Sequence, residues 1–146
     1  MITDKLLRVS EDQAVTATAV STNTIDLGVA RDMGEGQNLY VVFTVTETFA
    51  TLTSLTIDVV TDSAAALSSP AVNASSGAIT LAGGGLAAGQ QHVIAINPDI
   101  AGVGERYLGA KYTVSGSNAT TGKITADIVL DIQDGKKSYA SGFTVA

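Results

Sequence analysis

The sequence predicts an all-β protein: a single-domain β-sandwich, with a jelly roll as the favoured arrangement. Several segments alternate between apolar and polar residues with a period of two, which is typical of strands with one buried face. No segment carries a sustained apolar stripe at the 3.6-residue period of an amphipathic helix. The strands are short and unevenly spaced, and one long irregular segment, residues 63–89, separates them, which favours strands that cross between two sheets.

Length and composition are compatible with a protein that folds around one apolar core. A chain of 146 residues is of single-domain size and buries roughly two-thirds of its unfolded surface, so it needs no covalent staples. The absence of cysteine excludes disulfides and thiolate metal sites. Hydrophobic residues make up 45% of the chain but aromatic residues only 5%, so we expect strands that pack through small side chains.

The elements follow from the alternation and from the turn residues between them. Residues 1–13 have weak patterning and are predicted to form an N-terminal arm, and residues 14–146 are predicted to form the sandwich domain. The predicted strands are residues 14–20, 24–27, 39–46, 55–60, 92–96, 108–114 and 123–132, with a further short strand at 78–81 inside the loop 63–89. Residues 31–37 are predicted to be a loop, and residues 138–146 a last short strand or a tail that lies on a neighbour.

Two late segments give the strongest strand signal. From Leu108 to Val114 the even positions are apolar, and from Ile124 to Ile132 the even positions are apolar again. The residues between them, 115–122, all favour turns. The pattern therefore predicts an antiparallel hairpin with a mobile loop.

Charge and hydropathy argue against two classes of partner, nucleic acids and membranes. The net charge is −6, and the eight basic residues are scattered along the chain, so no stripe that could follow a phosphate backbone is expected. No apolar run approaches the roughly 18–20 residues of a membrane helix. The N-terminal segment lacks the apolar core of a signal peptide, so we expect a protein that is made and folded in a cytoplasm.

His92 is the single histidine and the default candidate for a general base. Asp58, Asp62 and many serines could complete a triad, but no serine lies in a G-x-S-x-G elbow. His92 also begins an apolar strand, which favours a structural or surface role. We therefore predict that the protein is not an enzyme and has no catalytic residue.

The glycine-containing motifs lack the residues that binding would require. No Gly-Lys-Ser/Thr follows the glycines at 83–85, and Ile124 stands after Gly122-Lys123 where a phosphate loop needs a hydroxyl. Residues 102–104 lack the third glycine of a dinucleotide fingerprint, and residues 131–135 lack the closing glutamate of a calcium loop. We predict no cofactor site and no metal site.

A set of sequence blocks spread over most of the chain resembles a known family. The blocks are residues 14–28, then Ala30-Arg31-Asp32 with Gly34, Gly36 and Leu39-Tyr40, and later residues 104–108, 112–114 and 122–126. In order and spacing they resemble the capsid cement, or decoration, proteins of tailed bacteriophages, of the Bordetella short-tailed phage type. Residues 63–89 show little match.

The resemblance implies a function that the residues alone do not. It implies a jelly-roll subunit that forms a homotrimer on the outer capsid surface of the virion and clamps neighbouring major capsid proteins, so stabilising the mature shell. If the protein has this function, we expect the arm 1–12, the loop 63–89 and the tail 138–146 to pair as added strands with a neighbouring protein. The alternative is a receptor- or carbohydrate-binding β-sandwich module on the phage surface, although few aromatic residues are present for stacking on sugars. An enzyme such as a small esterase ranks last.

Overall fold

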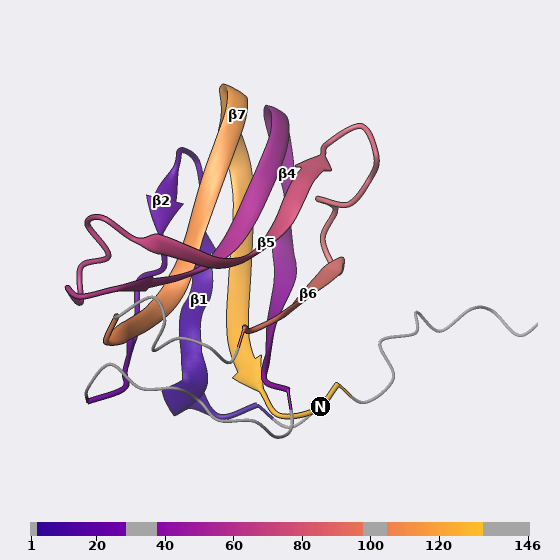
Figure 1. Cartoon of the computed structure of the whole chain (residues 1–146). Helices are drawn as coiled ribbons and strands as arrows, with labels where there is room; N and C mark the ends of the chain where they lie inside the picture. The colour runs from indigo at the N-terminus through magenta and orange to yellow at the C-terminus, as the bar shows by residue number, and fades with distance from the viewer. Residues whose placement is uncertain (1–2, 29–37, 98–104, 133–146) are drawn as a thin grey trace, which may run out of the picture.

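The computed structural model describes residues 3–28, 38–97 and 105–132. Its described part is all-β, as predicted, and its helical content is a single turn of 3-10 helix. Figure 1 shows the elements, which in chain order are η1 (Lys5–Leu7), β1 (Arg8–Ala14), β2 (Ala19–Val20), β3 (Ile25–Asp26), β4 (Tyr40–Asp62), β5 (Ala71–Thr80), β6 (Gln91–Ala95) and β7 (Tyr107–Val129).

Two long strands, β4 and β7, organise the whole fold. They pair antiparallel from end to end, with Tyr40 opposite Val129 and Asp62 opposite Tyr107. The register shifts repeatedly between Val45 and Ser54, and bulges of this kind bend a strand. Both strands therefore fold back at the top of Figure 1, and each contributes one arm to each of two layers.

The two layers have the strand order of a jelly roll. In the first layer, β1 pairs with the second arm of β7, which pairs with the first arm of β4, which pairs with β6. In the second layer, β2 and β3 pair with the first arm of β7, which pairs with the second arm of β4, which pairs with β5. When the arms are counted separately, the chain alternates between the layers except from the second arm of β4 to β5, which are neighbours in one layer, and this is the strand order of a jelly roll. The predicted β-sandwich with jelly-roll order is confirmed.

The core lies between the layers and consists of the inward-facing residues of the four arms. These residues are Val41, Phe43, Val45, Leu55, Ile57, Val59, Leu108, Ala110, Tyr112, Ile124, Ala126 and Ile128. The ring of Phe43 meets the ring of Tyr112 edge-on, with centroids 6.2 Å apart and planes at 90°. Burial of each large aliphatic or aromatic side chain contributes about 1.5–3 kcal/mol, so this set supplies most of the driving force for the sandwich.

One polar chain crosses the core between the layers. The hydroxyl oxygens of Ser10 and Tyr112 lie 2.7 Å apart, and Ser10 donates to Gln13 Oε1 at 2.7 Å. Because a serine hydroxyl has one hydrogen, Tyr112 donates to Ser10. Gln13 Nε2 in turn donates to the carbonyl of Val20 at 2.8 Å. Burial raises the pKa of the Tyr112 hydroxyl, which keeps the donor protonated.

The predicted N-terminal arm, residues 1–13, is wrong from Arg8 onward. Arg8–Ala14 form β1, and this strand pairs with the second arm of β7. Its register shifts twice, and Val9 and Ser10 are both buried, so the period-two pattern that marks a strand is lost. The predicted strand 14–20 is largely the turn that leads from β1 into β2.

The predicted hairpin between residues 108–114 and 123–132 is also wrong. Both segments belong to β7, and they lie in different layers, each paired with an arm of β4. The turn-forming residues between them serve as the corner of one bent strand. Gly116 and Gly122 take positive φ angles of 83° and 137° there, which favour glycine.

The long loop predicted at residues 63–89 contains a ten-residue strand. Ala71–Thr80 form β5, whereas the sequence indicated a strand only at 78–81. Its alanine, serine and glycine residues have low strand propensity, and pairing with β4 overrides that preference. The predicted loop 31–37 and tail 138–146 lie outside the described residues.

Candidate functional site

His92 makes a structural contact. It lies on β6, and its Nε2 atom is 2.7 Å from the carbonyl oxygen of Gly85. Because a carbonyl only accepts, Nε2 carries the proton. A side chain at Gly85 would place its Cβ 2.7 Å from Ile79 Cγ2, so the loop packs closely between β5 and the histidine ring. The glycines at 83–85 therefore belong to a packed connection. That no residue of the protein is catalytic stays a prediction.

The described residues offer no group of three or more histidine, aspartate or glutamate side chains that could hold a metal ion. Lys123, which follows Gly122 in the sequence, instead forms an ion pair with Glu47 at 3.1 Å. The glycines at 102 and 104 lie outside the described residues. In the described part of the chain, no helix is long and apolar enough to cross a membrane.

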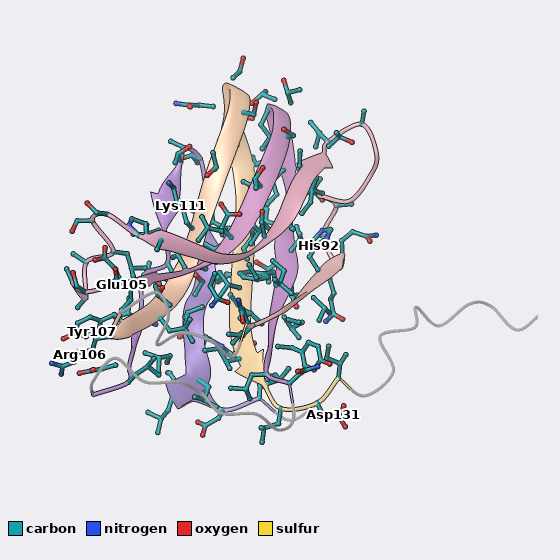
Figure 2. All side chains as sticks on the ribbon, viewed as in Figure 1. His92, Glu105, Arg106, Tyr107, Lys111 and Asp131 are labelled. Carbon is teal, nitrogen blue, oxygen red and sulfur yellow. The ribbon has the colours of Figure 1, made fainter. Side chains whose placement is uncertain are left out.

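We call the region where β4 and β7 begin and end the base. One of its contacts is a two-pronged ion pair: Arg106 Nε and Nη2 lie 2.6 Å from the two carboxylate oxygens of Asp26. The guanidinium also lies 5.1 Å from the ring centroid of Tyr107, and Figure 2 shows both side chains at the lower edge of the second layer. The hydrogen bonds from Arg106, followed by the N–H of Gly28, lower the pKa of Asp26 to about 2. Both partners are 45% exposed, so the pair adds little stability but keeps the charges of this surface fixed.

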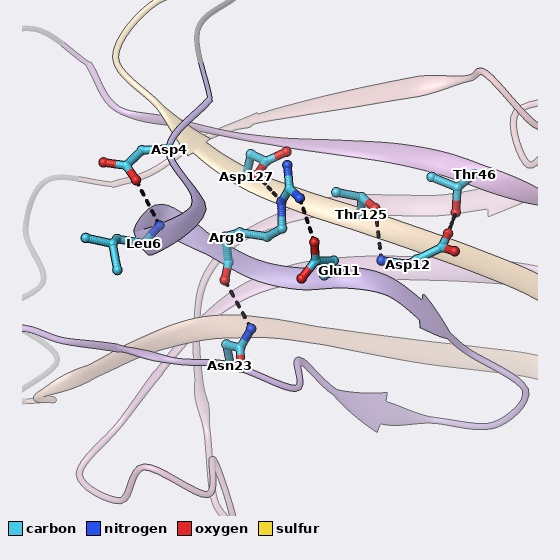
Figure 3. Close-up of polar contacts among 9 residues, drawn as sticks. All are labelled: Asp4, Leu6, Arg8, Glu11, Asp12, Asn23, Thr46, Thr125 and Asp127. Atoms are coloured by element: carbon cyan, nitrogen blue, oxygen red, sulfur yellow. Dashed lines mark hydrogen bonds and ion pairs between the residues drawn. The ribbon is translucent and has the colours of Figure 1, made fainter.

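A second ion pair holds β1 to the first layer (Figure 3). Arg8 Nε lies 2.7 Å from Asp127 Oδ1, and Arg8 Nη1 lies 3.1 Å from Glu11. The Asp127 side chain is only 8% exposed, so its charge needs this partner. The hydrogen bond that Arg8 donates to Asp127 is the main cause that raises the pKa of Arg8.

The loop at residues 63–70 is tied down at the base by Asp62. The Asp62 carboxylate accepts from the N–H groups of Ala64 at 3.0 Å and Ser69 at 2.8 Å, and these bonds lower its pKa. Leu67 is thereby pressed onto the outer face of the second layer, where only 2% of it is exposed. A Cβ at Gly109 would come within 2.6 Å of Leu67 Cδ1, so the leucine lies directly over this glycine.

The base also exposes leucines. A shallow hollow of about 310 Å³ is lined by Asn38, Tyr40, Leu130 and Asp131, and Leu130 is 66% exposed. Leu6, on the turn before β1, is 83% exposed and points away from the sheet in Figure 3. Charged residues stand beside each of these leucines in the sequence.

The opposite end, which we call the apex, is built from residues 16–18, 48–53, 81–90 and 115–121. Thr51 joins its two corners: its hydroxyl lies 2.7 Å from the carbonyl of Asn118 and accepts from the N–H of Thr120. The φ angle of Thr51 is +72°, which is strained for a β-branched residue and shows how firmly the corner is held.

Backbone bonds tie the remaining segments of the apex to these corners. The N–H of Ala119 donates to Thr16, and the N–H of Phe49 donates to Leu86. Phe49 and Leu86 are themselves buried beneath the surface. The apex is therefore a single connected surface that lies over apolar side chains.

The apex carries no charged side chain in any of its four segments. Its exposed residues are threonine, serine, alanine, glycine and asparagine. The sequence analysis missed this surface because it interpreted residues 115–122 as a mobile loop and assigned no structure to residues 50–53. The sequence feature that could have indicated this surface is the absence of charged residues from two runs, 48–57 and 112–122.

Comparison with known families adds to this geometry. The Bbp16 family matches residues 9–128, a span that contains nearly all of the described strands. The chain belongs to the Bbp16 family. This is a Bordetella phage protein family, so Bbp16 membership confirms the phage part of the resemblance and indicates a virion protein. Among curated proteins, none matches the chain.

Proposed function

We propose that this Bbp16-family protein is a decoration protein that binds the outer surface of a phage capsid and stabilises the mature shell by clamping neighbouring major capsid proteins. The observation that carries the proposal is the family match over residues 9–128. The structure of the described residues agrees with a structural role, because the polar side chains of β1 and of the base are engaged in ion pairs and turns that stabilise the fold.

The stabilising effect would follow from linkage. A ligand that binds the assembled lattice and not the separated subunits stabilises the lattice by RT ln(1 + [L]/Kd), which is about 2.7 kcal/mol per site at a hundredfold excess over Kd. The sandwich suits this task because its layers are joined by bent strands, so force applied at one end is carried through continuous backbone.

The homotrimer expected from the resemblance remains part of the proposal. Three linked weak contacts would become one tight attachment, because after the first contact forms, the others occur at high effective concentration. Light scattering of the isolated protein is expected to give a β-rich trimer. A stable monomer near 14.8 kDa at high concentration would count against this part of the proposal without affecting capsid binding itself.

The test is sedimentation with capsids. Purified protein is mixed with capsids that lack it, the capsids are pelleted, and the pellet is analysed for the added chain and for resistance to heat. We expect saturable binding and a higher temperature of shell disruption. Capsids that already carry the protein are the control and should take up little more. A protein that stays in the supernatant at saturating concentration would refute the proposal.

A receptor- or carbohydrate-binding module is the alternative function. Sugar sites usually use exposed aromatic rings for stacking, but among the described residues the large exposed hydrophobic side chains are Leu6, Leu7, Val72, Val93 and Leu130. Tyr107 is partly covered by Arg106. Clear binding in a glycan screen would favour the alternative, and an empty screen together with capsid binding would exclude it.

A further inference from the structure

We infer that the uncharged apex is the surface that contacts the capsid and that the charged base stays toward solvent. This inference rests on the proposed decoration function and names the face that performs it. It identifies the partner as a charge-poor patch of folded capsid protein.

Charge is distributed unevenly between the apex and the base. Every charged side chain of the described residues lies outside the four apex segments. The charged residues nearest to the apex segments in sequence, Glu47 and Lys123, form an ion pair at 3.1 Å, and Asp12 places a further negative charge near Lys123. The cores of protein interfaces are depleted in charged residues, because a charge that loses water without a matched partner is costly. Of the two ends of the described sandwich, the apex is free of charge and the base is charged, so a protein of net charge −6 would reach another protein surface more easily through the apex than through the base.

The apex is also held rigidly by its own contacts. Its exposed side chains are short, so they lose little rotamer freedom on binding, whereas long charged side chains lose much. The corner bonds of Thr51 hold β4 to β7, and Phe49 and Leu86 fill the space beneath. A surface that is already ordered before contact binds at a lower entropic cost than a mobile loop.

The base is the rival surface, since Leu6 and Leu130 are exposed there. These leucines are interrupted by Asp4, Lys5 and Asp131, and the Arg106–Asp26 pair is exposed in the same region. Contact through the base would have to remove water from several charges at once. The two surfaces therefore predict different responses to salt and to added charge.

The salt experiment measures capsid binding of the full chain at low and at high ionic strength. If the apex makes the contact, affinity should change by less than about twofold between roughly 50 and 500 mM NaCl, because there are no charges in the contact to screen. A fall of about tenfold or more would indicate a charged contact and would overturn the inference.

The mutational experiment places the same new charge on each surface. Ser117→Glu adds a carboxylate to the apex corner, and Ser68→Glu adds one beside Ser69, which is hydrogen-bonded to Asp62 in the base. Both serines are exposed, so both variants should keep the thermal unfolding temperature and the oligomeric state of the wild type. Ser117→Glu is expected to weaken capsid binding by about tenfold or more, and Ser68→Glu by less than about twofold.

The outcomes separate the inference from the proposed function. If wild-type protein binds capsids and Ser117→Glu weakens the binding, the apex is the contact. If wild-type protein binds and Ser117→Glu has no effect, or Ser68→Glu is the harmful change, the inference fails while the decoration function stands. If wild-type protein does not bind, the decoration function itself fails.

Discussion

Gly122→Ala tests whether the turn-like residues between the two apolar segments of β7 form a packed corner or a mobile loop. The φ angle of Gly122 is +137°, a value that residues with a Cβ rarely adopt, at a cost of about 1–3 kcal/mol. An added Cβ would also lie 2.2 Å from Phe49 Cδ1, far closer than van der Waals contact. Forcing an extra methyl into a packed core costs about 1–3 kcal/mol more. The expected loss in unfolding free energy is therefore about 2–6 kcal/mol.

Gly84→Ala is the matched control. Gly84 also has a positive φ angle, +73°, but a Cβ there meets no atom within 4 Å. The control measures the cost of a left-handed backbone without steric overlap, which is about 1–2 kcal/mol. The assay is urea unfolding followed by far-ultraviolet circular dichroism, with the midpoint and the slope compared among the wild type and both variants. If Gly122→Ala lost no more stability than Gly84→Ala, the corner would not be packed against Phe49 and the bent-strand argument would be wrong.

Three further changes test the core and the base. Tyr112→Phe removes the hydroxyl that donates to the β1 serine and should cost about 1 kcal/mol in urea unfolding; a loss near zero would mean that this bond contributes nothing. Leu108→Ala should cost about 2–5 kcal/mol because the side chain is fully buried, whereas His92→Ala should leave capsid binding intact. Any turnover that disappears with His92→Ala alone would refute the structural role of this residue. The pKa of Asp26 is about 2 when folded and 3.8 when unfolded, so the stability it contributes is present above 3.8 and is lost as the pH falls toward 2. Thermal scans of wild type and Asp26→Asn should therefore converge across that pH window, and a constant difference would exclude the linkage.

The fold class could be predicted because alternation is a local property. The period-two patterns at residues 39–46 and 55–60 lie in the two arms of β4, and those at 108–114 and 123–132 lie largely in the two arms of β7. Each segment identifies its own buried face without reference to any other part of the chain. The resemblance to a phage family is likewise carried by the order of residues, and the family match over residues 9–128 supports it.

The pairing could not be predicted, because it depends on contacts between residues far apart in the chain. Residues 115–122 favour turns in isolation, yet the strained Thr51 and the packing of Phe49 on Gly122 make them the corner of a continuous strand. Arg8–Ala14 look like an arm because their pattern is irregular, yet Asp127 and Tyr112 hold them in the first layer. The apex exists only once four uncharged segments, distant in sequence, are brought to one end of the sandwich. The sequence by itself determined the fold class, the apolar faces of the long strands β4 and β7, and the scarcity of charge in certain runs, because these properties are local. Only the tertiary structure decided that these runs share one surface, because that depends on where β4 and β7 bend.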